Sequence, residues 1–225
     1  MTSTYNVLIV DDHPLIIKAY DSALQHISKL DPNVNFNIET AADCDSAYQK
    51  ITESQNNDGI DLVFLDIKLP PSKDGKIISG EDLGLKIREE LDTVKIIIST
   101  MFDDNNRLHS ILKNVNPDGF LIKSELTPDT LTDAITTVLT NPPYYSKPVL
   151  KLLRKMSTSN FVLDTIDRKL LYELSRGTKM KELPNILLLS IAALERRKRI
   201  LKELFNVVGK GDRALIDTAE EKGFI

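Results

Sequence analysis

The sequence lacks the features that mark a secreted or membrane-bound protein. It has a single cysteine, Cys44, so no disulfide can form within the chain, and this fits a reducing compartment. No hydrophobic stretch approaches the roughly 20 residues of a membrane-spanning helix. The first residues lack the basic and then apolar segments of a signal peptide. We therefore expect a globular protein that resides in the cytoplasm and has no membrane partner.

The chain also lacks a strong net charge, but its charges are unevenly distributed. The formal net charge is −4 over 225 residues, which by itself does not favour a nucleic-acid binder. Residues 160–225 nevertheless hold 13 Lys and Arg against 10 Asp and Glu, whereas residues 1–159 hold 16 against 23. This asymmetry suggests two domains with different partners.

Four short hydrophobic runs each lead directly into polar residues. Short apolar runs bounded by breakers are typical of strands buried on both faces. The carboxyl ends of parallel strands lie at one edge of a sheet, so the polar residues that follow are expected to converge there. These residues are Asp11-Asp12 after 7–10, Asp66 after 62–65, Ser99-Thr100 after 96–98, and Lys123 after 120–122.

The groups expected at this edge are those that phosphoryl transfer needs. An aspartate can act as a nucleophile and form an aspartyl phosphate, which is the role we predict for Asp66. Asp11 and Asp12 would supply the hard oxygen ligands that suit Mg²⁺. Thr100 and Lys123 would contact the phosphoryl group. A lone aspartate after a strand is more often only a loop cap, so the prediction depends on the convergence of the strand ends.

Residues 5–140 resemble the receiver domain of two-component response regulators. The resemblance implies that a sensor histidine kinase phosphorylates Asp66. It also implies that the backbone carbonyl of Lys68 binds Mg²⁺ together with Asp11, Asp12 and Asp66, and that Thr100 and Phe120 form the switch. Such a protein is no enzyme beyond autophosphorylation from small phosphodonors and slow self-dephosphorylation. The matching motifs, in order, are Val10-Asp11-Asp12-His13, Leu65-Asp66-Ile67-Lys68-Leu69-Pro70, Ser99-Thr100-Met101 and Gly119-Phe120-Leu121-Ile122-Lys123.

The alternation of five strands with five helices predicts an α/β fold for residues 1–140. We expect a doubly wound, flavodoxin-like, five-stranded parallel sheet in the order 2-1-3-4-5, with Phe36–Thr40 as an edge strand. Asn141-Pro142-Pro143 breaks the pattern, and residues 141–160 are expected to form a partly helical linker. The long loop 71–80 beside Asp66 either gates access to the site or is a solvated insertion.

Residues 161–225 predict a small all-α domain of the helix-turn-helix type. Asp164 and Asp167 would cap a first helix, Met180–Leu183 would form a very short helix, and Ser190 would cap a helix over Ile191–Phe205. A last helix is expected over Leu215–Lys222. This region resembles the LuxR-type DNA-binding domain that often follows a receiver. The resemblance rests on Leu170-Leu171, Gly177, Met180-Lys181-Glu182-Leu183, Ser190, Ile200, Leu204, Ala214-Leu215 and Gly223-Phe224-Ile225.

The helix over Ile191–Phe205 would then be the recognition helix. Helical spacing turns Arg196 and Arg199 outward on one face, and Lys202 extends that face. On charge alone, the simpler interpretation is that this is a solvated helix face without a partner. The candidate DNA contacts are Ala192, Ala193, Glu195, Arg196, Arg197, Arg199 and Lys202.

These patterns together predict a response regulator that controls transcription by binding double-stranded DNA, as a homodimer once phosphorylated. Two other classes of protein stay open. One class is the phosphatases with a nucleophilic aspartate, which are similar in having the motif Asp-x-Asp-x-Thr. This chain has Lys68 in place of the second aspartate of that motif. A receiver linked to a protein-interaction module fits the small excess of positive charge, and it would lack the steep salt dependence of DNA binding.

Overall fold

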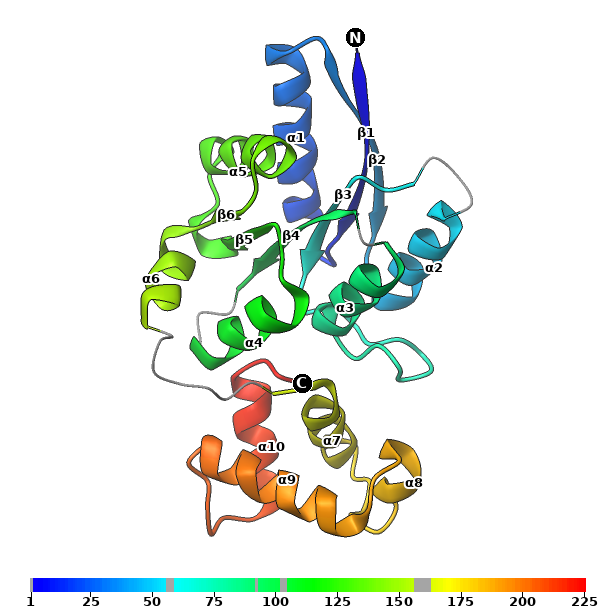
Figure 1. The fold of residues 1–225 in the computed structure, drawn as a ribbon, viewed down its shortest axis with the longest axis vertical. Coiled ribbons are helices and arrows are strands. Elements are labelled where there is room, and N and C mark those ends of the chain that lie inside the picture. Colours follow the sequence, from blue (N-terminus) through cyan, green and yellow to red (C-terminus); the bar gives the residue numbers. More distant parts are fainter. Residues whose placement is uncertain (1, 56–58, 92, 102–104, 156–162) are drawn as a thin grey trace.

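The computed structural model describes residues 2–55, 59–91, 93–101, 105–155 and 163–225. Its N-terminal part is a parallel sheet in the order β2-β1-β3-β4-β5-β6, with helices on both faces (Figure 1). The first five strands have the order that the sequence predicts for a flavodoxin-like sheet. The strands are β1 (Ser3–Val10), β2 (Val34–Ala41), β3 (Leu62–Asp66), β4 (Lys95–Thr100), β5 (Gly119–Ile122) and β6 (Tyr144–Tyr145).

The sixth strand is an addition to the predicted five. It lies in the segment that the sequence pattern marked as a boundary, just after Pro143. Tyr144 N donates to Asp118 O and Ser146 N donates to Phe120 O, both at 2.9 Å, so β6 pairs with the outer side of β5. These bonds satisfy carbonyl groups that would otherwise form an open sheet edge. A strand of two residues beside two prolines has no periodicity by which it could be predicted.

Successive side chains of the strands point into two separate cores. Val7 and Ile9 pack against α1 (Pro14–Leu30) and α5 (Pro128–Thr140). Leu8 and Val10 belong to the other core, which α2 (Cys44–Ser54), α3 (Gly80–Glu90) and α4 (Asn105–Val115) cover. Since both faces of the sheet are buried, both sets of strand positions must be apolar, and this explains the continuous hydrophobic runs.

Two helix starts of the N-terminal part are fixed by capping bonds. The Asp43 side chain accepts a hydrogen bond from Ser46 N at 2.8 Å and begins α2. Thr127 begins α5 through a capping box with Thr130, and Pro128 occupies the first turn, where its missing N–H costs nothing.

The C-terminal helices enclose a third core. The helix α6 (Lys147–Lys155) precedes these helices in the chain and packs beside β5.

The prediction of a short helix over Met180–Leu183 was wrong. The helix α8 begins at Leu183 and has Pro184 in its first turn, a position that tolerates proline. The last helix begins three residues earlier than predicted. The four helices are α7 (Thr165–Ser175), α8 (Leu183–Leu187), α9 (Ile191–Leu204) and α10 (Asp212–Glu221).

Leucines and phenylalanines at helical spacing fill this third core. Leu194 and Leu201 are both buried, two turns apart on α9, and the rings of Phe205 and Phe224 lie 5.5 Å apart. Within the described residues, none of the helices has the length and apolar character that crossing a bilayer demands.

Candidate functional site

Asp66 ends β3, and its carboxylate is buried against a lysine. The residue is 3% exposed, and Lys123 donates Nζ to Asp66 Oδ2 at 2.7 Å. The same ammonium group lies 2.8 Å from Asp11 Oδ2. One cation from the end of β5 therefore joins the carboxylates that end β1 and β3. The structure brings these three side chains together at the carboxyl edge of the sheet.

Burial governs the acid–base properties of Asp66. Removal from water raises the pKa of this carboxyl, because the ionised form is disfavoured in the interior. The Lys123 ammonium and the backbone N–H of Lys68 act in the opposite direction, and the pKa stays above its ordinary value. A poorly hydrated carboxylate held by an ammonium group is suited to act as a nucleophile or a cation ligand.

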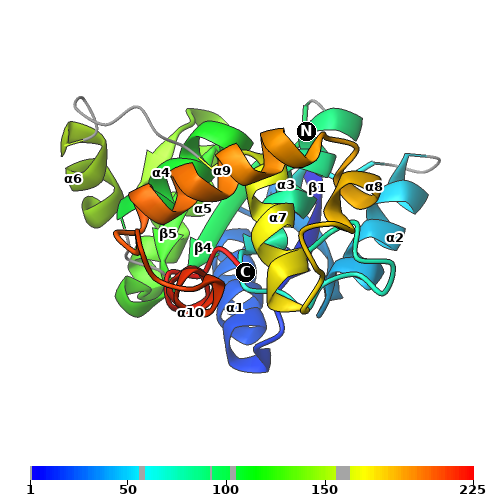
Figure 2. The same ribbon diagram turned by 90° about the horizontal axis from the view of Figure 1, so that it is seen from below.

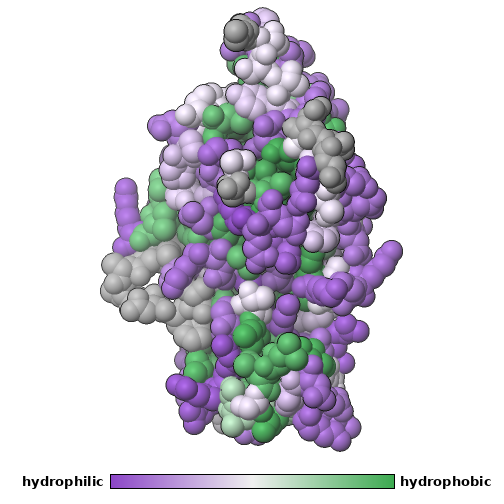
Figure 3. Space-filling model, turned by 45° about the vertical axis from the view of Figure 1, so that its right-hand side comes forward, coloured by the Kyte–Doolittle hydropathy of each residue, from purple (hydrophilic) through white to green (hydrophobic). Residues whose placement is uncertain are grey.

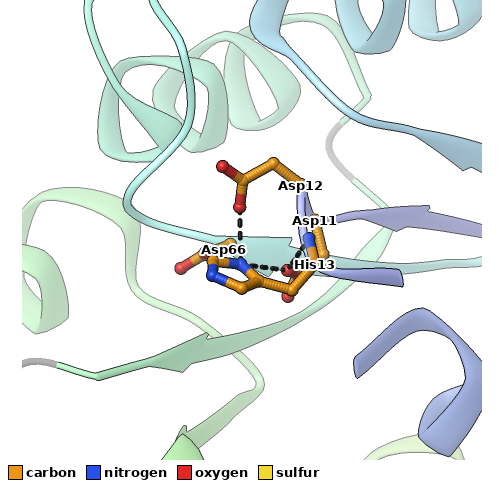
Figure 4. A group of neighbouring side chains, drawn as sticks. All are labelled: Asp11, Asp12, His13 and Asp66. Atoms are coloured by element: carbon orange, nitrogen blue, oxygen red, sulfur yellow. Dashed lines mark hydrogen bonds and ion pairs between the residues drawn. The ribbon is translucent and has the colours of Figure 1, made fainter. Parts of the chain in front are cut away.

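Asp12 and His13 lie beside Asp11 and Asp66 (Figure 4), and both are exposed. The ligand atoms of Asp11, Asp12, His13 and Asp66 all lie within 4.8 Å of one another. His13 Nδ1 is 2.6 Å from Asp12 Oδ1 and 3.3 Å from Asp11 Oδ1. Three carboxylates supply the hard oxygen atoms that Mg²⁺ prefers, so the donor set fits this ion. His13 lies beside these carboxylates as a neighbour.

Lys68, Thr100 and Phe120 lie around the same edge. Lys68 N donates to Asp66 Oδ1 at 3.2 Å, which puts its backbone beside the carboxylate. Thr100 ends β4 and is wholly buried, one residue after Ser99, the partner of Asp66 in the β3–β4 ladder. Phe120 is wholly buried in the core on the α4 side of the sheet. Their roles as metal ligand and switch stay predictions.

The long loop after β3 is folded against the domain. Ser72 N donates to Ile77 O at 2.8 Å, and Ile77 N donates to the Ser72 hydroxyl at 3.0 Å. Ile77 and Ile78 are each 6% exposed, and Ile77 belongs to a hydrophobic core. The loop is therefore not a fully solvated insertion, and its possible gating role stays a prediction.

The first turn of α3 lies directly against the backbone of Asp66. A Cβ atom on Gly80 would be 1.8 Å from the Asp66 carbonyl oxygen, so only glycine fits there. Gly80 N also donates to Ile67 O at 3.0 Å. The start of α3 and the end of β3 therefore form one tightly packed unit.

The next two residues of α3 bind an arginine of the C-terminal helices. Arg168 of α7 is wholly buried and forms ion pairs with Glu81 through Nη1 and with Asp82 Oδ1 through Nη2, the latter at 2.6 Å. Asn114 of α4 also donates to Glu81 Oε1, at 2.7 Å, and to the Leu163 carbonyl, at 3.1 Å. The C-terminal helices are thus joined to the helix that begins beside Asp66.

A cavity of about 330 Å³ lies beside this contact. Its walls come from the segment after Asp66, from the loop that follows, and from α7 and the C-terminal end of the chain. The lining residues are Ile67, Lys68, Leu69, Pro71, Ile78, Ser79, Tyr172, Glu220, Gly223, Phe224 and Ile225.

The helix α9 lies on the side of the C-terminal helices that faces away from the sheet. Seen from below, it crosses the face of the molecule nearest the viewer (Figure 2). Ala192, Glu195, Arg196 and Arg199 are exposed along this helix, and Ala193 is half-buried. Arg196 and Arg199 form no ion pair with any described residue. Four of the predicted DNA contacts are therefore available on one open face.

Two other cations of α9 are held within the domain. Arg197 Nη1 lies 2.8 Å from Asp164 Oδ2 and 2.7 Å from Asp167 Oδ1. Lys202 Nζ lies 2.8 Å from Asp212 Oδ1, and Lys198 Nζ lies 2.9 Å from Asp212 Oδ2. These pairs join the recognition-type helix to α7 and α10, so Arg197 and Lys202 have a structural partner that the sequence did not indicate.

Sequence reasoning also missed the contact between α3 and α7. Glu81 and Asp82 read as ordinary acidic residues in the first turn of a helix, and Arg168 reads as a surface residue after a cap. The partners lie 87 and 86 residues apart in the chain, so no periodic pattern relates them. The composition and spacing of the sequence therefore give no indication that these two consecutive acidic residues are buried.

Comparison with known proteins gives the family of the N-terminal part. The model of the response regulator receiver domain matches residues 7–136. The oxygen regulatory protein NreC of Staphylococcus carnosus is 25% identical over 229 residues, covering 96% of this chain and 97% of that protein. NreC of Staphylococcus aureus is 27% identical over 205 residues, covering 85% and 87%.

A solved structure has the same arrangement of folds over nearly the whole chain. RcsB from Salmonella enterica serovar Typhimurium, bound to promoter rprA in the presence of a phosphomimetic, has a TM-score of 0.66 and 22% identity. The match covers 97% of this chain and 99% of RcsB. The fold similarity and the family match agree with the carboxylate–lysine geometry at the sheet edge. The chain therefore belongs to the response regulators, with a receiver domain that spans residues 7–136.

Proposed function

We propose that this chain is a DNA-binding response regulator of the cytoplasm whose activity depends on phosphorylation of Asp66. In this proposal residues 1–140 are the phosphoacceptor domain, 141–160 the linker and 161–225 the output domain. The observation that carries it is the buried Asp66 carboxylate, held by Lys123 at 2.7 Å beside Asp11 and Asp12. A structural ion pair alone would not need the two further carboxylates.

The proposed reaction transfers a phosphoryl group from a sensor histidine kinase. The phosphorus–nitrogen bond of the donor phosphohistidine breaks while a bond forms between phosphorus and an Asp66 oxygen. Lys123 would contact the phosphoryl oxygens, as would the Thr100 hydroxyl. Asp11, Asp12, Asp66 and the Lys68 carbonyl would hold Mg²⁺, which neutralises charge on the phosphoryl group when bound. Small phosphodonors would replace the kinase, and hydrolysis of the acyl phosphate would be slow.

The output step is binding to double-stranded DNA as a homodimer. RcsB has been solved bound to a promoter, and its fold matches 97% of this chain with a TM-score of 0.66. The open face of α9, with Arg196 and Arg199, supports the same role here. Thr100 and Phe120 would bias the receiver between two states, and the dimer would form in the phosphorylated state.

Phosphorylation is tested by treating the full chain with a small acyl phosphate and Mg²⁺. Asp66→Asn should abolish phosphorylation on a phosphate-affinity gel. Asp61→Asn is the matched control, because Asp61 lies next to the start of the same strand and accepts a hydrogen bond from Asn6 N that asparagine can keep. Full labelling of the Asp66→Asn variant would refute the assignment.

The metal site is tested by calorimetry with Mg²⁺. Asp12→Ala should weaken binding by about tenfold or more, since loss of even an outer-shell partner costs 10–100-fold. His13→Ala should leave the affinity within about threefold, because imidazole is a poor ligand for this ion. Equal effects of the two substitutions would place the ion elsewhere.

A further inference from the structure

Three aliphatic side chains stand exposed at the turn between α8 and α9. Ile186 is 49% exposed, Leu188 is 86% exposed and Ile191 is 41% exposed. We name this group the apolar turn surface. Leu188 has a φ of 54°, in the left-handed region that a leucine rarely adopts, and its side chain is directed into solvent rather than into the core below. Figure 3 shows hydrophobic residues gathered on the lower part of the molecule, where these helices lie.

The apolar turn surface is continuous with the open face of α9. Ala192 is exposed next to Ile191, and the exposed Arg196 and Arg199 follow one and two turns later on the same face. An occupant of this face must therefore offer apolar groups at one end, acceptors or negative charge opposite Arg196 and Arg199, and a donor for the exposed Glu195.

The size of the surface argues against a protein occupant. Three side chains of this kind present a few hundred Å² at most, whereas each partner in a stable protein interface contributes about 500 Å² or more. The major groove of DNA meets both requirements on a small footprint. Its edges carry the thymine C5-methyl group, which is apolar, while guanine acceptors and backbone phosphates suit arginine.

We propose that the apolar turn surface, with Ala192, recognises thymine methyl groups in the major groove. This inference rests on the proposed DNA-binding function and names the bases that this part of the site reads. In helix-turn-helix proteins the N-terminal residues of the recognition helix contact base edges. Here the residues at that end are Ile191 and Ala192, whose side chains have no hydrogen-bonding group. Readout at this end therefore depends on methyl contact, and the preferred half-sites contain thymine there.

The test uses the full chain, phosphorylated with a small acyl phosphate. Preferred duplexes are selected from a random library, and each thymine is then replaced singly by deoxyuridine, which removes only the methyl group. At the recognised positions the parent protein should lose about fourfold in affinity per methyl, the value expected for one buried carbon group. Leu188→Ala and Ile191→Ala should bind the thymine duplex more weakly and show little further loss with deoxyuridine.

A leucine far from this surface provides the matched control. Leu30, at the end of α1, is 68% exposed, so Leu30→Ala removes a similar side chain and should keep the full deoxyuridine penalty. The inference is overturned if a selected duplex binds tightly but no deoxyuridine weakens it, or if the penalty is unchanged in Leu188→Ala and Ile191→Ala. Selection of no duplex at any salt concentration would instead overturn the proposed DNA binding and this inference with it.

Discussion

The guanidinium of Arg168 and the carboxylate of Asp82 lie 2.6 Å apart at a site where neither residue is open to solvent. Arg168 belongs to α7 and Asp82 to α3, so this contact joins the C-terminal helices to the receiver. Glu81 accepts from the same guanidinium. Charges that are removed from water need partners, and each member of this cluster depends on the others.

Removal of the guanidinium should destabilise the whole chain. Arg168→Ala leaves Glu81 and Asp82 without their cation, and we expect a loss of about 3–5 kcal/mol in the free energy of unfolding. Chemical denaturation of the full chain measures it. Lys169→Ala is the matched control, since Lys169 is partly exposed and forms no ion pair with any residue that the structure describes, and it should change stability by about 0.5 kcal/mol or less. Similar losses for both variants would contradict the buried cluster.

Glycine at position 80 is expected to be indispensable. In Gly80→Ala the new methyl group would meet the Asp66 carbonyl oxygen at 1.8 Å, and backbone cannot move aside as a side chain can. We expect a loss of about 3 kcal/mol or more in stability, together with slower phosphorylation of Asp66. Gly211→Ala, where nothing lies within 4 Å of the added atom, is the control and should cost much less. A fully stable Gly80→Ala protein would show that α3 begins elsewhere.

Asp118 should make stability depend on pH in the acidic range. Although burial alone would raise the pKa of this carboxyl, hydrogen bonds from Arg88 and from Ile96 N hold it below its ordinary value. The contribution of the ionised form is present above the unfolded pKa near 3.8 and is lost as the pH falls through the lower folded pKa.

Asp118→Asn should therefore be less stable than the parent at pH 7 by about 1–3 kcal/mol. The difference should shrink below about pH 4, where the unfolded carboxyl becomes protonated. Unfolding curves recorded across this range measure it. If the stability difference between the parent and Asp118→Asn stayed constant down to the most acid pH, the loss would come from altered packing and not from the lost charge.

The arginines of α9 should separate into two functional groups. Arg196→Ala should weaken binding to the preferred duplex by about 1–3 kcal/mol if it reads a base. If Arg196 contacts only phosphate, the loss should be even across sequences, with a shallower salt dependence. Arg197→Ala should mainly lower stability, because it frees Asp164 and Asp167 from their ion pairs.

DNA binding would be measured by fluorescence anisotropy, and stability by denaturant unfolding, on the parent, Arg196→Ala and Arg197→Ala proteins. A double variant, Arg196→Ala with Arg199→Ala, that is folded and binds as tightly as the parent would remove α9 from the DNA interface.

Most of the receiver fold follows from local patterns in the sequence. The hydrophobic runs before Asp66 and Asp11 predict buried strands because a doubly covered sheet requires apolar residues on both faces. Caps such as Asp43 and Thr127 are local too, since the donor and acceptor are three residues apart. The convergence of Asp11, Asp66 and Lys123 was predictable because parallel strands bring their ends to one edge.

The parts that were not predicted depend on contacts between distant residues. The strand β6 exists because β5 offers a free edge, and its own two residues carry no alternation. The short helix was predicted over Met180–Leu183, whereas α8 begins at Leu183 and holds Pro184 in its first turn. Arg197 was grouped with its basic neighbours, and only the fold brings Asp164 and Asp167 to it.

The buried carboxylate of Glu81 also limits how the chain can be divided for experiments. Ser110 and Asn114 of the receiver donate to it, but its cationic partner comes from α7. A fragment that stops at the end of α6 would keep the acidic pair at the start of α3 and lose the guanidinium that neutralises it. Water would then have to enter between α3 and α4, next to the turn that packs on Asp66. An excised receiver is therefore a poor surrogate for the intact protein. Rates of phosphorylation measured on it would belong to a protein in which the first turn of α3 has different surroundings.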